Sequence, residues 1–167
     1  MKVIANTTVI SNFASVGQLE LLHSLLVEVY ISTEVYGEIQ DGTTEGIEHY
    51  QGIEKDIYPF SPDGWLHLTS LQGDDEFRLF NSLPAALHRG ESSCLAIALA
   101  RGWAFITDDS RARKAAHSLS IPISGTLGLL IEAVKTDLLS VSEADNLLHE
   151  MILLGYRSPH GTVSELM

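Results

Sequence analysis

The sequence predicts a single α/β domain in which helices cover both faces of a mostly parallel sheet. Short apolar runs alternate with segments whose leucines and alanines recur at helical spacing, which is the pattern of β-α-β units. The chain has 167 residues, of which 45% are hydrophobic, enough for one sizeable core. Polar or acidic residues directly follow two of the apolar runs, at the strand ends where such sheets hold ligands.

Five segments have the composition of strands. The first is a short apolar run, and the second is β-branched and aromatic, as strands often are. The third alternates apolar and polar side chains, which favours a strand or a sheet edge. The expected strands cover residues 3–5, 27–31, 65–71, 103–107 and 121–123.

Helices are expected between and after these strands. Ser15 and Gln18 have capping-box spacing ahead of a leucine-rich run, and Ser140 and Glu143 have the same spacing ahead of the last helix. Thr33 can cap a further helix. The polar stretch 41–63 is weakly periodic and predicts a modest helix between loops. The remaining helices are expected at residues 74–83, 91–100, 110–118 and 127–134.

Composition and charge exclude several classes of protein. A net charge of −12 disfavours general adhesion to nucleic acid, although the basic residues are concentrated after residue 77 and leave room for a local basic rim. The only cysteine, Cys94, lies among apolar residues and predicts a reducing compartment. The N-terminal residues lack an export signal and no stretch is long enough to span a bilayer, so we expect a cytoplasmic protein without membrane contact.

Four segments carry amide or acidic side chains that indicate metal chemistry. They are Asn6 after the first strand, Glu38 on the inner face of a helix, Glu91 at a helix start, and Asp108 and Asp109 after the fourth strand. Each alone has an ordinary explanation as a turn residue, a solvated side chain or a helix cap. Carboxylates brought together at one sheet edge repel one another unless a hard divalent cation lies among them. The sequence therefore predicts a metal-binding enzyme.

The same segments resemble the motifs of the PIN-domain ribonucleases. VIANTTVI is similar to their opening strand, YISTEVYGEI to their second motif, and GESSCLAIALARGWAFITDD to their third and fourth motifs. The likeness covers roughly residues 2–155 and is strongest to a PIN-like branch related to VapC-type toxins, with Gly-Thr-Leu-Gly near the end, here at 125–128. It implies a three-layer α/β/α sandwich with a central, mostly parallel sheet of four to five strands over residues 1–156, followed by a C-terminal tail at 157–167.

The resemblance also implies roles for individual residues. The catalytic set falls on Asn6, Glu38, Glu91 and Asp109. The ligands of Mg²⁺ or Mn²⁺ fall on Glu38, Glu91, Asp108 and Asp109. The family's first acid is an Asp, so the amide at position 6 removes one charge and one strong ligand.

Substrate contacts are expected on both sides of these acids. The family's polar residue after the first acid falls on Thr7 or Thr8. The helix expected after Asp109 carries three basic residues, Arg111, Arg113 and Lys114. They either bind the RNA backbone or form an ordinary solvated face.

The activity implied by the resemblance is metal-dependent hydrolysis of RNA by the toxin of a toxin–antitoxin pair, with a small antitoxin protein as partner and a homodimer as the assembly. A catalytically degenerate PIN-like module that binds proteins is the alternative, because of Asn6. A phosphoacceptor domain is less favoured, because its lysine late in the sheet has no counterpart in IPISG. Dinucleotide binding is disfavoured, because no Gly-x-Gly-x-x-Gly follows a strand.

Overall fold

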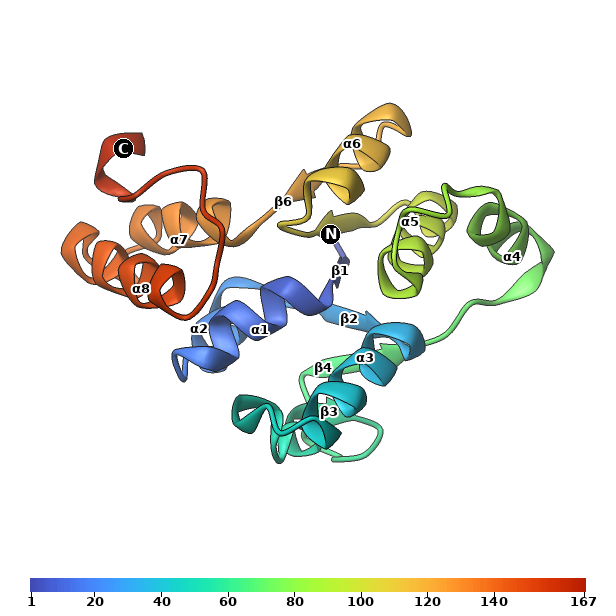
Figure 1. Ribbon diagram of the computed structural model, residues 1–167, viewed down its shortest axis with the longest axis horizontal. Coiled ribbons are helices and arrows are strands. Elements are labelled where there is room, and N and C mark those ends of the chain that lie inside the picture. The colour runs from blue at the N-terminus through green and yellow to red at the C-terminus, as the bar shows by residue number, and fades with distance from the viewer.

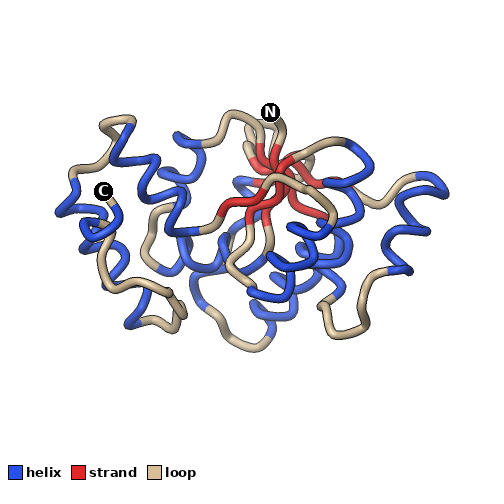
Figure 2. The backbone as a smooth tube through the Cα atoms, turned by 90° about the horizontal axis from the view of Figure 1, so that it is seen from above, coloured by secondary structure: helices blue, strands red, loops and turns tan.

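A computed structural model describes all 167 residues and has a central parallel sheet of six strands (Figures 1 and 2). The order of the strands is β3-β4-β2-β1-β5-β6, and every neighbouring pair is parallel. The strands are β1 (Val3–Ala5), β2 (Val29–Ser32), β3 (Ile57–Tyr58), β4 (Leu66–Thr69), β5 (Ala104–Ile106) and β6 (Ile123–Ser124). The predicted α/β class is confirmed, with one strand more than expected.

Eight α-helices and three short 3₁₀ helices connect and cover the strands. The α-helices are α1 (Thr7–Ser15), α2 (Leu19–Leu25), α3 (Thr33–Thr44), α4 (Gly73–Ser82), α5 (Arg89–Arg101), α6 (Ser110–Ser118), α7 (Thr126–Lys135) and α8 (Val141–Leu153). The 3₁₀ helices are η1 (Glu48–Tyr50), η2 (Ile53–Asp56) and η3 (Ser164–Leu166). None of the helices combines the length and apolar character needed to cross a bilayer.

The sheet lies between two layers of helices. In Figure 1 it runs from β6 at the top to β3 at the bottom, with α1, α2 and α7 on its left and α5 and α6 on its right. Figure 2 shows the strands gathered in the upper central part of the view, with helices on both sides of them and below. The core between the layers contains fully buried Ile4, Phe13 and Phe105, so β1 and β5 are covered on both faces, as expected of central parallel strands.

Capping at the N-terminal half differs from the prediction. Ser15 and Gln18 do not form a capping box, because Ser15 ends α1 and Gln18 precedes α2 without a side-chain cap. The glycine between them, Gly17, has a φ of 68°, a left-handed conformation in the turn that separates α1 from the leucine-rich helix α2. The cap of α3 is Ser32, whose Oγ accepts from Val35 N at 3.0 Å, rather than Thr33.

The C-terminal half follows the prediction more closely. The Ser140 and Glu143 side chains each accept the other's backbone N–H, at 3.1 and 2.7 Å, so the predicted capping box is confirmed. The segment after α8 packs back onto that helix, with Val163 fully buried. Asp145 on α8 holds it by accepting from the backbone N–H of Val163 and of Ser164, at 2.6 and 3.0 Å.

Candidate metal centre and adjoining cavity

Asn6 joins the end of β1 to the start of α1. Its Oδ1 accepts from Thr7 N at 2.8 Å and caps the helix, and its Nδ2 donates to Thr107 Oγ1 at 3.2 Å. The same Thr107 oxygen accepts from Asp109 N at 3.2 Å, so Asn6 is linked through one hydroxyl to the end of β5. The Asn6 side chain is buried, and its amide is used in aligning two strand ends.

Glu38 projects from the middle of α3 toward the starts of two other helices. Its Oε1 accepts from Gly90 N at 3.1 Å, and its Oε2 accepts from the hydroxyl of Thr7. A side chain at position 90 would place its Cβ 2.6 Å from Glu38 Oε1, so this close approach requires glycine. The predicted inward orientation of Glu38 is confirmed.

Glu91 lies in the first turn of α5 and is 5% exposed. Its Oε2 accepts from His88 N at 3.0 Å, which ties it to the helix start. Burial raises the pKa of the Glu91 carboxyl, the nearby Asp109 and Glu38 carboxylates raise it further, and the His88 hydrogen bond acts in the opposite direction. Glu38 from α3 and Asp109 from the end of β5 therefore each lie close enough to Glu91 to disfavour its charged form.

Asp109 completes this group as the N-cap of α6, where its Oδ1 accepts from Ala112 N at 2.8 Å. Its other oxygen is left for a further interaction. The starts of α1, α5 and α6 thus each carry one of the predicted site residues, Asn6, Glu91 and Asp109. The positive ends of helix dipoles favour anions, which offsets part of the repulsion and suits a phosphate ligand.

Asp108 is held away from this group by a network of its own. Its Oδ1 accepts from Thr126 N at 2.8 Å and from the Tyr156 hydroxyl at 3.4 Å. Its Oδ2 accepts from Thr126 Oγ1 at 2.5 Å and from Asn12 Nδ2 at 2.9 Å. Both oxygens of this predicted ligand are therefore engaged in joining β5 to α1, to α7 and to the segment after α8.

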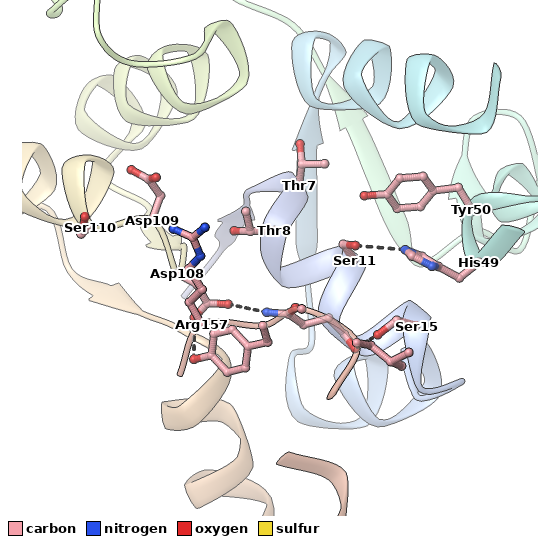
Figure 3. A pocket seen from close by; sticks show the side chains of 14 residues that line it. Thr7, Thr8, Ser11, Ser15, His49, Tyr50, Asp108, Asp109, Ser110 and Arg157 are labelled. Carbon is pink, nitrogen blue, oxygen red and sulfur yellow. Dashed lines mark hydrogen bonds between the residues drawn. The ribbon is translucent and has the colours of Figure 1, made fainter. Parts of the chain in front are cut away.

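A cavity of about 540 Å³ opens beside Asp109 (Figure 3). Residues from α1, η1, the end of β5 and the segment after α8 line it, and most of them are polar: Thr7, Thr8, Ser11, Asn12, Ser15, His49, Tyr50, Asp108, Asp109, Ser110, Leu154, Gly155, Tyr156 and Arg157. Figure 3 shows the Ser11 hydroxyl and the His49 ring in contact on one side of it, with 3.0 Å between Ser11 Oγ and His49 Nε2.

The predicted substrate residues are divided between this cavity and other surfaces. Thr7 and Thr8 both line it. Arg113 donates to Thr107 O at 2.9 Å and lines an adjoining cavity of about 260 Å³. Arg111 and Lys114 are exposed on α6 and line neither cavity.

Several residues around the site carried no usable signal in the sequence. Ser11 and His49 come from segments without a motif, and they meet only through the packing of η1 on α1. Arg157 belongs to the expected C-terminal tail, so its position in the cavity wall depends on the fold of that tail. Thr126 lies inside the Gly-Thr-Leu-Gly segment, whose composition alone did not indicate a partner for Asp108.

The donors present fit Mg²⁺ or Mn²⁺ bound largely through water. No group of three or more His, Cys, Asp or Glu side chains has the spacing for joint coordination of one ion. Mg²⁺ commonly uses only one or two carboxylates, keeps several waters and adds oxygens of the substrate phosphate. Glu38, Glu91 and Asp109 supply oxygen donors that repel one another without a cation, so their chemistry matches such an ion.

Comparison with known proteins agrees with this architecture. A solved structure of a PilT N-terminus domain protein from the hyperthermophilic archaeon Sulfolobus solfataricus P2 is similar, with a TM-score of 0.55 and 15% sequence identity over 81% of this chain and 95% of that chain. At this identity the likeness concerns the fold alone. A comparison with curated proteins gives no match. The family model described as "DUF3368: PIN domain" matches residues 2–167. The chain therefore belongs to this PIN-domain family.

Proposed function

We propose that this chain is a ribonuclease that uses Mg²⁺ or Mn²⁺ to hydrolyse phosphodiester bonds of RNA. The observation that carries the proposal is the approach of Glu38 and Asp109, from two distant segments, to the buried Glu91, whose charged form a cation would stabilise. PIN-domain membership supports it, since nuclease activity is typical of that domain. A cytoplasmic location, where RNA is abundant, is part of the proposal.

The chain's own residues would bind and orient the substrate. Glu38, Glu91 and Asp109 would hold the ion largely through its bound waters, and Thr7, fixed by Glu38, would face the substrate from α1. When bound, such an ion lowers the pKa of water and neutralises charge on the phosphate. Asp108 would have a structural role, because its hydrogen bonds fix the positions of Asn12 and Thr126 around the end of β5.

Asp109→Asn provides the test of this function. Asn is as good an N-cap as Asp, so α6 should remain intact while the site loses one carboxylate. Purified wild-type protein should cleave RNA in the presence of Mn²⁺, and Asp109→Asn should lower the rate by about 10²-fold or more. Asp63→Asn, which changes an exposed acid in the loop before β4, is the matched control and should cleave normally. Equal cleavage by Asp109→Asn and wild type would refute the assignment.

The proposal includes a toxin role, which rests on the family resemblance. In that role the chain would bind a small antitoxin protein and a second copy of itself. Induced expression should arrest cell growth, with relief by Asp109→Asn and by an adjacently encoded antitoxin. Growth arrest by Asp109→Asn as strong as that by wild type would oppose a toxin acting through RNA cleavage.

A degenerate binding module is the second candidate, and Asn6 is the observation that favours it. The amide uses both of its polar groups inside the protein and adds no charge to the site. This candidate predicts no RNA cleavage with Mn²⁺ by wild type or by Asp109→Asn, together with retained binding of an antitoxin-like protein.

A further inference from the structure

The cavity beside the acids has one strongly cationic side chain, Arg157. In Figure 3 its guanidinium points toward the side of the cavity where Asp109 and Thr8 lie. Arg157 forms no salt bridge, although two aspartates line the same cavity. In a chain with a net charge of −12, an arginine free of carboxylate partners at this position is suited to an incoming anion.

A second arginine lies along the same path. The adjoining cavity shares Asp108, Tyr156 and Arg157 with the first one and adds Arg113. Arg113 is anchored by donating to the Thr107 carbonyl, so its position is fixed by the end of β5. The two cavities therefore adjoin at these shared residues and bring Arg157 and Arg113 to neighbouring surfaces, which matches the repeated charge of a phosphodiester chain.

The opposite wall of the first cavity is polar without a permanent charge. Ser11 and His49 contact each other there, and burial lowers the pKa of His49, which favours a neutral imidazole. A hydroxyl beside a neutral imidazole offers both a donor and an acceptor. The ribose 2′-hydroxyl has the same two capacities, and it is the group that distinguishes RNA from DNA.

We propose that this cavity binds the nucleotide next to the cleaved bond in single-stranded RNA, with Arg157 on its phosphate and Ser11, supported by His49, on its 2′-hydroxyl. The proposal rests on the proposed ribonuclease function and specifies its substrate contacts. A cavity bounded by α1, η1 and the segment after α8 admits an unstacked nucleotide, as single-stranded RNA provides.

Binding without cleavage tests the two contacts separately. Affinities of labelled single-stranded oligouridylate and of the matching oligodeoxyuridylate are measured by fluorescence anisotropy in EDTA over a range of salt concentrations. Arg157→Ala should weaken binding of both oligonucleotides about tenfold and should reduce the slope of log affinity against log salt by about 0.7, the value for one phosphate of a single strand. Ser11→Ala should lower the affinity for RNA several-fold, leave that for DNA unchanged, and preserve the salt slope.

Arg78→Ala is the matched control, since it removes the same charge from the exposed face of α4, where Arg78 pairs with Asp75 at 3.4 Å. Melting temperatures of all variants verify their folding. If Arg157→Ala and Arg78→Ala bind alike, the phosphate contact is wrong, and an unchanged preference for RNA in Ser11→Ala refutes the sugar contact. A wild type that binds with these effects but never cleaves RNA contradicts the proposed function and leaves the binding site standing. A wild type that neither binds nor cleaves RNA overturns both.

Discussion

Glu91 is the residue at which stability and the proposed function conflict most directly. Its carboxyl is buried beside two others, and burial followed by those charges raises its pKa above the ordinary value of 4.5. The contribution of such a carboxyl to the free energy of unfolding is largest below the pKa that it has in the unfolded chain, because it is then protonated in both states. That stability is lost as the pH rises through the folded pKa, because ionisation in the folded protein is opposed.

Glu91→Gln should therefore raise the stability of the metal-free protein and abolish RNA cleavage in the presence of Mn²⁺. Gln keeps an acceptor for His88 N and removes the charge. In EDTA at neutral pH the free energy of unfolding should rise by about 0.5–2 kcal/mol, with a gain that shrinks toward pH 4. Urea unfolding followed by circular dichroism at several pH values measures this, and cleavage with Mn²⁺ should be lost. A destabilised Glu91→Gln in EDTA would show that the acids do not repel one another.

Asn6 is the residue at which the chain departs from the family's acidic pattern, and Asn6→Asp restores the acid. Asp keeps the cap of α1, and Thr107 can reverse its hydroxyl to donate to the new carboxylate. The added negative charge should tighten Mn²⁺ binding by about tenfold and lower the melting temperature in EDTA. Calorimetric titration with Mn²⁺ checks this result. Unchanged Mn²⁺ affinity in Asn6→Asp would place the ion away from the end of β1.

At the level of elements, the site depends on how closely α3 approaches α5. Gly90→Ala should keep the fold and impair the site, because its Cβ would lie 2.6 Å from Glu38 Oε1 and displace that carboxylate. Alanine is the better helix former by about 0.8–1.0 kcal/mol, and the displaced group is the end of a flexible side chain, so thermal stability should change little. RNA cleavage with Mn²⁺ should fall about tenfold or more. Gly37→Ala, at a glycine of α3 with open space around it, is the control and should stay active.

Other elements show which features were predictable from the sequence. The strand β5 and the helix α6 after it were predicted well, because a buried apolar run followed by Asp109 has both strand composition and a capping residue. The first helix, at residues 7–15, was not predicted, since Asn6 in the sequence indicates a turn or a ligand, and it proves to be a helix cap. The two-residue strand β3 was missed, because its pairing with β4 is a tertiary effect that a polar, aperiodic segment does not reveal.

For the whole molecule, the parallel topology converts distant residues into neighbours. The neighbourhood of Asn6 and Asp109 could be predicted, because they follow the parallel strands β1 and β5, which end at the same edge of the sheet. The wall formed by Ser11 and His49 could not, since it depends on a 3₁₀ helix packing across α1. Arg157 was likewise inaccessible to sequence reasoning, because the last residues reach the cavity only after folding back on α8.

Because the C-terminal segment folds back on α8, we predict that Asp145 affects RNA binding in the cavity from a distance. Asp145→Ala removes the acceptor of the Val163 and Ser164 N–H groups, so residues 156–167 should detach from α8 more often and Arg157 should be held less firmly. Limited proteolysis should cut the variant within this segment faster than wild type, while the rest of the chain stays resistant. RNA affinity in EDTA should fall, by less than in Arg157→Ala, because the arginine is still present. Glu150→Ala removes an exposed acid from the same helix and should match wild type in both measurements. If the protease cuts the C-terminal segment of Asp145→Ala faster but RNA affinity does not fall, the fold of the last residues is not needed for RNA binding in the cavity.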